Sequence, residues 1–146
     1  LFECVEEAIH LLSLQKDRPR VHFNNLMAPD TLVLGSEQTL TQLFINLLSN
    51  ARDASPPESP VDISSALAGD RIIVRIRDYG HGVDPQHLAR LFEPFFTTKP
   101  AGQGTGLGLS LVYSIVEDHG GHIDVKSPVD NDGGTEFILS FPALPA

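Results

Sequence analysis

Apolar residues recur at helical spacing in three parts of the chain. Residues 36–55 hold the longest run, in which apolar side chains stand at i, i+3, i+4 and i+7 and stop at a pair of prolines. Ser36 begins this run and is a residue type that caps helix N-termini well. Two more helices are predicted, at about residues 4–15 with an end near Asp17 and at about 107–119. The three apolar stripes comprise Val5, Ala8, Ile9 and Leu12; Leu40, Leu43, Phe44, Leu47, Leu48 and Ala51; and Leu111, Val112, Ile115 and Val116.

Alternation of apolar and polar residues predicts strands between these helices. Two hairpins are expected, one from 61–67 and 71–78 across Ala68-Gly69-Asp70, the other from 122–127 and 135–141 across Asp132-Gly133-Gly134. Short strands at 20–26 and 31–34, a turn at 28–30, a short helix near 85–92 and an irregular region at 93–106 complete the prediction. Strand pairs separated by helices favour an α+β fold, a two-layer α/β sandwich with helices on one face of a mixed, mostly antiparallel sheet.

Composition and charge narrow the classes of function. The 146 residues fit one domain, and a net charge of -9 disfavours binding to nucleic acid through phosphate neutralisation. A single cysteine, Cys4, excludes an internal disulfide and a cysteine-based zinc cluster. No run reaches the length of a membrane span, and no signal-peptide pattern opens the chain. Because the chain begins at Leu1 and not at a methionine, we expect a piece of a longer protein. The single cysteine fits a reducing compartment such as the cytoplasm.

Glycine alternates with other residues in Gly102-Gln-Gly-Thr-Gly-Leu-Gly-Leu109, directly before the last predicted helix. Such a run lets several backbone N–H groups turn toward one point, and the helix N-terminus adds further donors and a favourable dipole. The combination suits a polyphosphate, although a flexible surface loop is the commoner fate of glycine-rich segments. No lysine follows a glycine, so there is no Walker A loop, and the spacing does not fit G-x-G-x-x-G.

Three polar residues share a stripe beside the apolar face of the predicted helix at 36–55. Asn46, Asn50 and Asp53 are spaced i, i+4 and i+7. Asparagines among leucines destabilise a protein unless their amides find partners, which can be neighbouring backbone groups. The functional alternative is that Asn50 offers an oxygen to Mg²⁺ that already holds phosphates, since Mg²⁺ takes only one or two protein ligands at such sites.

Asp78 falls in phase with the apolar residues Ile72, Val74 and Ile76 of its predicted strand. Its carboxylate should therefore point toward the covered face, where an unpaired charge is costly. A carboxylate that accepts from the exocyclic amine of a purine would explain this position. The alternative is an ordinary turn-forming aspartate at a strand end.

The segment Leu91-Phe-Glu-Pro-Phe-Phe-Thr-Thr-Lys99 is the third candidate element. Its phenylalanines can anchor a loop on the core. Lys99 at the tip of this loop can pair with a terminal phosphate, although most exposed lysines are simply solvated.

Five segments together resemble the motifs of sensor histidine kinases. Asn46-Leu-Leu-Ser-Asn50-Ala resembles the N box, and Asp78-Tyr-Gly-His-Gly82 resembles the G1 box. The F box, the G2 box and the G3 motif have counterparts in Leu91-Phe-Glu-Pro-Phe-Phe, Gly104-Thr-Gly-Leu-Gly108-Leu and Gly133-Gly-Thr135. These motifs stand in the family's order and cover nearly the whole chain. The resemblance implies a Bergerat-type ATP-binding fold, shared with gyrase, Hsp90 and MutL.

The resemblance also implies roles for individual residues. Asn50 would hold Mg²⁺, Asp78 would receive the adenine amine, and Gly80 and Gly82 would let the backbone approach the base. Thr135 would support the adenine through its hydroxyl. Residues 94–107 would form the ATP lid. The nucleotide-binding residues implied in and beside the lid are Phe95, Lys99, Gly102, Gly104, Thr105, Gly106, Leu107 and Gly108.

Two positions refine this expectation. Branches of the superfamily that hydrolyse ATP carry a glutamate, the general base for water, four residues before the magnesium asparagine. Here Asn46 stands in that place and cannot take a proton, which favours transfer over hydrolysis and makes Asn46 and Lys99 the implied catalytic residues. Many of these kinases also carry a lysine or arginine where this chain has Asp53, which lies among the implied cofactor-binding residues.

By this resemblance, the domain would bind Mg-ATP and donate the γ-phosphoryl group to a histidine on an upstream dimerisation domain. A response regulator would then receive the phosphoryl group, and the parent protein, free in the cytoplasm or anchored in the inner membrane, would be a homodimer. No histidine of the chain stands in an H box, so this fragment alone should bind ATP without phosphorylating itself. The alternatives are an anti-sigma-factor-type kinase that phosphorylates serine and a degenerate nucleotide-binding module that signals by docking.

Overall fold

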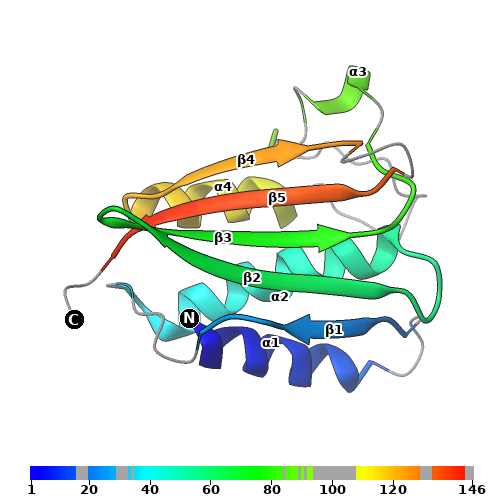
Figure 1. Cartoon of the computed structure of the whole chain (residues 1–146), viewed down its shortest axis with the longest axis horizontal. Coiled ribbons are helices and arrows are strands. Elements are labelled where there is room, and N and C mark those ends of the chain that lie inside the picture. The colour runs from blue at the N-terminus through cyan, green and yellow to red at the C-terminus, as the bar shows by residue number, and fades with distance from the viewer. Residues whose placement is uncertain are drawn as a thin grey trace.

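The fold is an open sheet covered by helices on one face, as the computed structural model in Figure 1 shows. The structure describes residues 1–15, 20–28, 33, 35–83, 85–88, 90, 92–93, 108–128 and 133–143. The elements in chain order are α1 (Phe2–Ser13), β1 (His22–Asn25), α2 (Glu37–Ala54), β2 (Pro60–Ala68), β3 (Arg71–Asp78), α3 (Pro85–Leu88), α4 (Gly108–Asp118), β4 (His122–Lys126) and β5 (Thr135–Pro142). Within these described residues, no helix has the length and apolar character needed to cross a membrane.

The five strands stand in the order β1-β2-β3-β5-β4. β1 and β2 are parallel, and the other three neighbouring pairs are antiparallel. Side chains of the helices and of the covered sheet face form one core, in which Phe44, Phe137 and Phe141 are among the largest fully buried residues. The predicted α+β sandwich with a mixed, mostly antiparallel sheet is therefore confirmed.

Helix α2 forms as its sequence predicts. The Ser36 hydroxyl accepts a hydrogen bond of 3.3 Å from the Thr39 backbone N–H and caps the first turn. Every residue of the predicted stripe is buried, namely Leu40, Leu43, Phe44, Leu47, Leu48 and Ala51. The helix ends at Ala54, before the two prolines.

Other predictions need correction. In α4, Val112, Ile115 and Val116 are buried as expected, but Leu111 is 44% exposed. Leu111 lies about 100° around the helix from Val112, which is enough to turn it off the sheet. α1 ends at Ser13 rather than near Asp17, and α3 stops at Leu88 rather than Phe92. Of the strand predicted at 31–34, only Val33 is described, and it is not in a strand.

Several elements meet at one edge of the sheet, on the right in Figure 1. There α2 ends, β3 and β4 end, and β5 begins. The backbone N–H of His81, just after β3, donates to the Ala54 carbonyl at the end of α2 over 3.3 Å. A Cβ atom on Gly80 would overlap that same carbonyl oxygen, so glycine lets the helix end and the strand end touch. This edge brings the polar residues of the motifs together.

Candidate functional site

Asp78 is the most buried acidic group of this edge, with 1% of its surface exposed. Its Oδ1 accepts a 2.9 Å hydrogen bond from the Gly80 backbone N–H, and the Thr135 backbone N–H also hydrogen-bonds the carboxylate. Burial raises the pKa of Asp78 above its ordinary value of 3.8, while these two hydrogen bonds and the nearby His81 and Arg77 lower it. Desolvation is the largest of these effects, so the carboxylate is held in an environment that disfavours its charge.

Asp78 lies in phase with the apolar residues of β3, as predicted. Ile72, Val74, Ile76 and Asp78 are all buried on the covered face of β3, and Arg75 between them is exposed. Thr135 at the start of β5 is the cross-strand partner of Asp78 and is 3% exposed. Residues directly opposite in an antiparallel pair have adjacent side chains. The sheet thus places a carboxylate and a hydroxyl side by side.

Glycines keep the backbone around these two side chains close together. Gly134 has φ of +85°, and a Cβ on it would lie 2.7 Å from the Asp78 carbonyl oxygen. Its N–H donates to the Gly80 carbonyl over 3.0 Å, which ties the start of β5 to the turn after β3. These contacts show that Gly80 and Gly134 make room for the protein's own backbone. The role of Gly80 and Gly82 toward an adenine base stays a prediction.

Ser127, which the sequence analysis did not single out, lies at the centre of this edge. Its hydroxyl receives a 2.7 Å hydrogen bond from the Val83 backbone N–H and donates to the Gly134 carbonyl over 3.0 Å. It also lies 3.2 Å from the Thr135 hydroxyl. The predicted hairpin of residues 122–127 and 135–141 held a signal for one of these contacts, because its first strand ends at Ser127 and its second begins at Thr135. The observed register, continued by one residue from Lys126↔Glu136, puts the two opposite each other.

Helix α2 presents its polar stripe as half-buried residues. Asn46 is engaged at both ends of its amide, since Gln42 donates to its Oδ1 over 2.9 Å and its Nδ2 donates to the Gly108 carbonyl over 3.4 Å. This contact joins α2 to the first residue of α4, so the structure brings together two residues of different motifs. The side chain of Asn50 makes no hydrogen bond to any other described residue.

Asp53 lies next to a buried cation. The Nε of Arg52 is 3.7 Å from Asp53 Oδ1, and the exposed fractions of the two side chains are 4% and 16%. Arg52 also donates to the Ser49 hydroxyl over 3.4 Å. The guanidinium is therefore held within the protein and is not turned outward.

The predicted lid, residues 94–107, lies entirely outside the described residues. This applies to Phe95, Lys99, Gly102, Gly104, Thr105, Gly106 and Leu107. Gly108 is described, and a Cβ on it would meet nothing within 4 Å. Phe92 packs its ring 5.7 Å from that of Tyr113 and 6.4 Å from that of Phe137, measured between centroids, so at least the first phenylalanine of the segment contacts the core.

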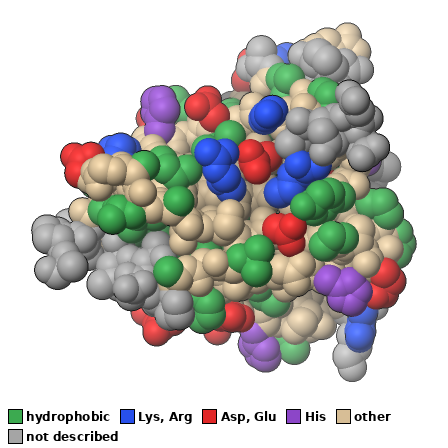
Figure 2. All heavy atoms as spheres, viewed as in Figure 1, with side chains coloured by type: hydrophobic (Ala, Val, Ile, Leu, Met, Phe, Trp, Pro, Cys, Tyr) green, Lys and Arg blue, Asp and Glu red, His purple; other side chains and the backbone are tan. Residues whose placement is uncertain are grey.

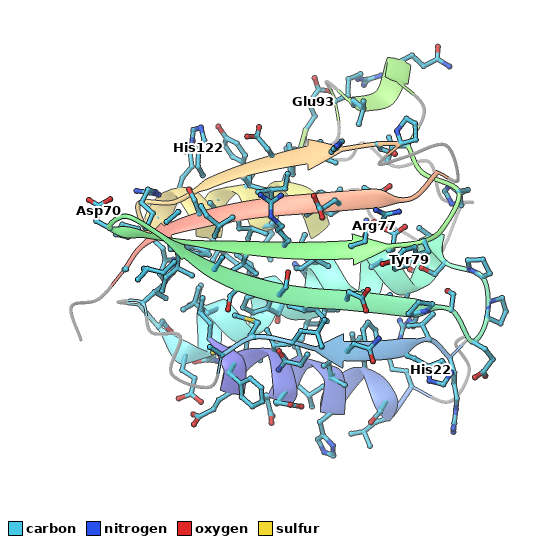
Figure 3. All side chains as sticks on the ribbon, in the orientation of Figure 1. His22, Asp70, Arg77, Tyr79, Glu93 and His122 are labelled. Carbon is cyan, nitrogen blue, oxygen red and sulfur yellow. The ribbon has the colours of Figure 1, made fainter. Side chains whose placement is uncertain are left out.

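The open face of the sheet is a surface of a different kind. Figure 2 shows basic and acidic side chains interleaved across it, and Arg75 pairs with Glu136 at 3.2 Å. Figure 3 labels Arg77 and Tyr79 at the end of β3, where the guanidinium lies 4.5 Å from the centre of the tyrosine ring. Its Nε donates to the Asp78 carbonyl over 3.0 Å. Arg77 thus supports the turn after Asp78 from the open face.

Taken together, the edge offers a buried carboxylate, an adjacent hydroxyl, glycine-lined backbone and an asparagine oxygen on the neighbouring helix. A buried acceptor of this kind suits a ligand that carries a hydrogen-bond donor, such as an amine. The asparagine oxygen suits a hard cation.

Comparison with known proteins identifies the class to which this fold and edge belong. Residues 35–145 match the family described as histidine kinase-, DNA gyrase B- and HSP90-like ATPases. The chain is 44% identical over 147 residues to the sensor histidine kinase ZraS of Salmonella typhimurium, covering 99% of this chain and 30% of that protein. It is 35% identical over 143 residues to sporulation kinase A of Bacillus subtilis, covering 97% of this chain and 23% of that protein.

Solved structures agree with this match. The mycobacterial sensor histidine kinase MprB superposes with a TM-score of 0.85 at 28% identity, over 99% of this chain and 95% of that one. Full-length ShkA in complex with AMPPNP superposes with a TM-score of 0.81 at 26% identity, over 99% of this chain and 30% of that one.

The chain therefore belongs to the family of histidine kinase-, DNA gyrase B- and HSP90-like ATPases. The resemblance carried by the five motifs is confirmed, and the relatives named here are kinases, which supports a general kinase role. The chain spans 23% and 30% of the length of the two curated relatives.

Proposed function

We propose that this chain binds Mg-ATP and donates the γ-phosphoryl group to a histidine of the parent sensor kinase. The domain boundaries 1–146, the lid at 94–107 and the individual site residues are part of this proposal. The phosphorylated histidine would lie upstream of Leu1, and a response regulator would receive the phosphoryl group from it.

The observation that carries the proposal is the buried Asp78 carboxylate. A charge with 1% exposure and a raised pKa lowers the stability of the fold unless a ligand uses it. The exocyclic amine of adenine is a donor that such an acceptor can receive. The AMPPNP-bound state of the structural neighbour ShkA supports a nucleotide as the ligand.

Asn50 fits the second part of the ligand. Asn50 is half-buried, and its side chain makes no hydrogen bond within the described part of the chain. Bound Mg²⁺ would neutralise the charge of the phosphates, and one neutral protein oxygen is sufficient because phosphates and water complete its shell. The described part of the chain thus provides a suitable ligand for the metal.

Asn46 favours transfer over hydrolysis. An amide cannot accept the proton of an attacking water, and here both ends of the amide are already engaged with Gln42 and Gly108. The domain would therefore act through positioning and charge stabilisation, with Lys99 and the lid glycines near the phosphates.

Titration calorimetry with Mg-ATP tests the binding step. The wild-type chain should release heat and saturate at one nucleotide per chain, whereas Asp78→Asn should bind at least about tenfold more weakly because the amide offers one acceptor instead of two. Asp124→Asn, on the exposed edge strand β4, removes an equal charge away from the site and should bind like wild type. Equal affinity in all three proteins would rule out Asp78 as the residue that recognises the base.

A further inference from the structure

Ser127 is bound by three groups that together fix the direction of every hydrogen bond around it. Val83 contributes a backbone N–H, which can only donate, and Gly134 contributes a carbonyl, which can only accept. A serine hydroxyl carries one hydrogen and accepts at two positions. Its hydrogen must therefore go to Gly134.

The contact between Ser127 and Thr135 then has a defined polarity. Since the hydrogen of Ser127 is used by Gly134, the 3.2 Å contact forms only if the Thr135 hydroxyl donates to Ser127. The single hydroxyl hydrogen of Thr135 is used in this bond. Toward any other group, the Thr135 hydroxyl oxygen can therefore only accept. The neighbouring Asp78 carboxylate, opposite Thr135 in the sheet, is also an acceptor.

The surrounding backbone is shaped to admit Ser127. Gly82 has φ of +79°, and a Cβ on it would lie 2.9 Å from the Ser127 hydroxyl oxygen. A larger residue at this position would displace the hydroxyl from the Val83 N–H. Gly82 of the G1 box thus has a steric role toward Ser127, which follows β4 and is far away in the sequence.

We infer that Ser127 is a positioning residue that sets base specificity, by holding the Thr135 hydroxyl as an acceptor beside Asp78. This inference rests on the proposed function. Two adjacent acceptors favour a base with a 6-amino group, which donates, and disfavour one with a 6-oxo group, which accepts. Ser127 itself need not touch the nucleotide.

Inosine triphosphate is a suitable probe because it differs from ATP by a 6-oxo group, with N1 protonated, in place of the 6-amino group. The dissociation constants of Mg-ATP and Mg-ITP are measured by displacement of a fluorescent ATP analogue, and their ratio is the readout. In Ser127→Ala the Thr135 hydroxyl regains a free hydrogen, so the ratio Kd(ITP)/Kd(ATP) should fall about three- to tenfold. Ser13→Ala, at the end of α1, is the matched control and should leave the ratio unchanged.

Variants of Thr135 keep the test valid if Ser127→Ala fails to fold. Thr135→Val replaces the hydroxyl by an isosteric methyl group and should lower the ratio, whereas Thr135→Ser retains the hydroxyl and should preserve it. A ratio within about twofold of wild type in both Ser127→Ala and Thr135→Val would overturn the inference. This holds even if the affinity for ATP falls, because a merely structural role weakens the binding of both nucleotides alike. If the wild-type chain binds no ATP, the proposed function fails as well; if it binds ATP but the ratio does not respond, only this inference fails.

Discussion

The buried charge of Asp78 lowers the stability of the folded chain, and the fold alone does not require a charge at this position. Its carboxylate lies at 1% exposure among apolar residues, and the hydrogen bonds from Gly80 and Thr135 offset only part of the desolvation. A neutral acceptor such as asparagine could take these hydrogen bonds without burying a charge. Residues of this kind are expected where binding, and not stability, explains their presence.

The pH dependence of stability follows from the direction of this pKa. Because the pKa of Asp78 is higher in the folded chain than its ordinary value of 3.8, the folded state binds this proton more tightly. The free energy of unfolding of the wild-type chain should therefore decrease as pH rises through the interval between 3.8 and the raised pKa of the folded state. Asp78→Asn lacks this titration, so the unfolding free energy of wild type relative to the variant should increase as pH is lowered from neutrality through that interval. Urea denaturation of both proteins across this pH range measures the difference between their unfolding free energies. A difference that stays constant with pH would contradict a raised pKa of Asp78.

Asn50 has a separate prediction that concerns the metal. Asn50→Ala should weaken nucleotide binding in the presence of Mg²⁺ by about three- to tenfold, and should change binding in excess chelator much less, because only the metal-bound state uses the amide oxygen. Asn24→Ala, on the open face where Asn24 bonds Asp62, serves as the control. Equal losses with and without Mg²⁺ would show that Asn50 acts on the fold or on the nucleotide directly.

At the scale of elements, the site depends on how closely the end of α2 approaches the turn after β3. Gly80 sits at this contact, and a Cβ there would overlap the Ala54 carbonyl. The approach also brings the polar stripe of α2 to the edge where Asp78 and Thr135 stand. The site therefore depends on the end of α2 keeping its position against the turn after β3.

Gly80→Ala tests this contact. The variant should be less stable than wild type by at least about 2 kcal/mol, because a rigid backbone oxygen occupies the space of the new methyl group. Gly69→Ala is the comparison: Gly69 has φ of +65° in the β2–β3 turn with nothing within 4 Å, so only the left-handed backbone should cost about 1 kcal/mol. Thermal denaturation of both variants gives the comparison, and a smaller loss at Gly80 than at Gly69 would contradict the steric account.

The sequence predicts the elements where periodicity is decisive. The stripe of α2 and the phase of Asp78 on β3 follow from spacings of 3.6 and 2, and both are confirmed. Leu111 was assigned wrongly because a residue at the edge of a helical stripe can turn either way, depending on the neighbour it meets. Ser127 was missed because its role comes from three backbone and side-chain partners that only the sheet register brings together.

For the whole molecule, the sheet separates two surfaces with different roles. The open face carries basic and acidic side chains, among them the ion pair of Arg75 with Glu136, whereas the edge beside α2 carries the buried Asp78 carboxylate, which accepts from the Gly80 N–H. The helices cover the other face and hold the core. After folding, described residues that are far apart in the sequence, such as Asp78, Ser127 and Thr135, come together at one edge of the sheet.

The central claim is transfer of a phosphoryl group to histidine, and one measurement tests it most directly. The chain is mixed with the upstream dimerisation domain proposed for its parent protein and with ATP labelled at the γ-phosphate. The labelled product is then treated with acid and with base. The account predicts a phosphorylated upstream segment whose label is lost in acid and kept in base, as expected for phosphohistidine, and no label on the chain alone. An acid-stable product, or release of labelled phosphate without any transfer, would contradict it.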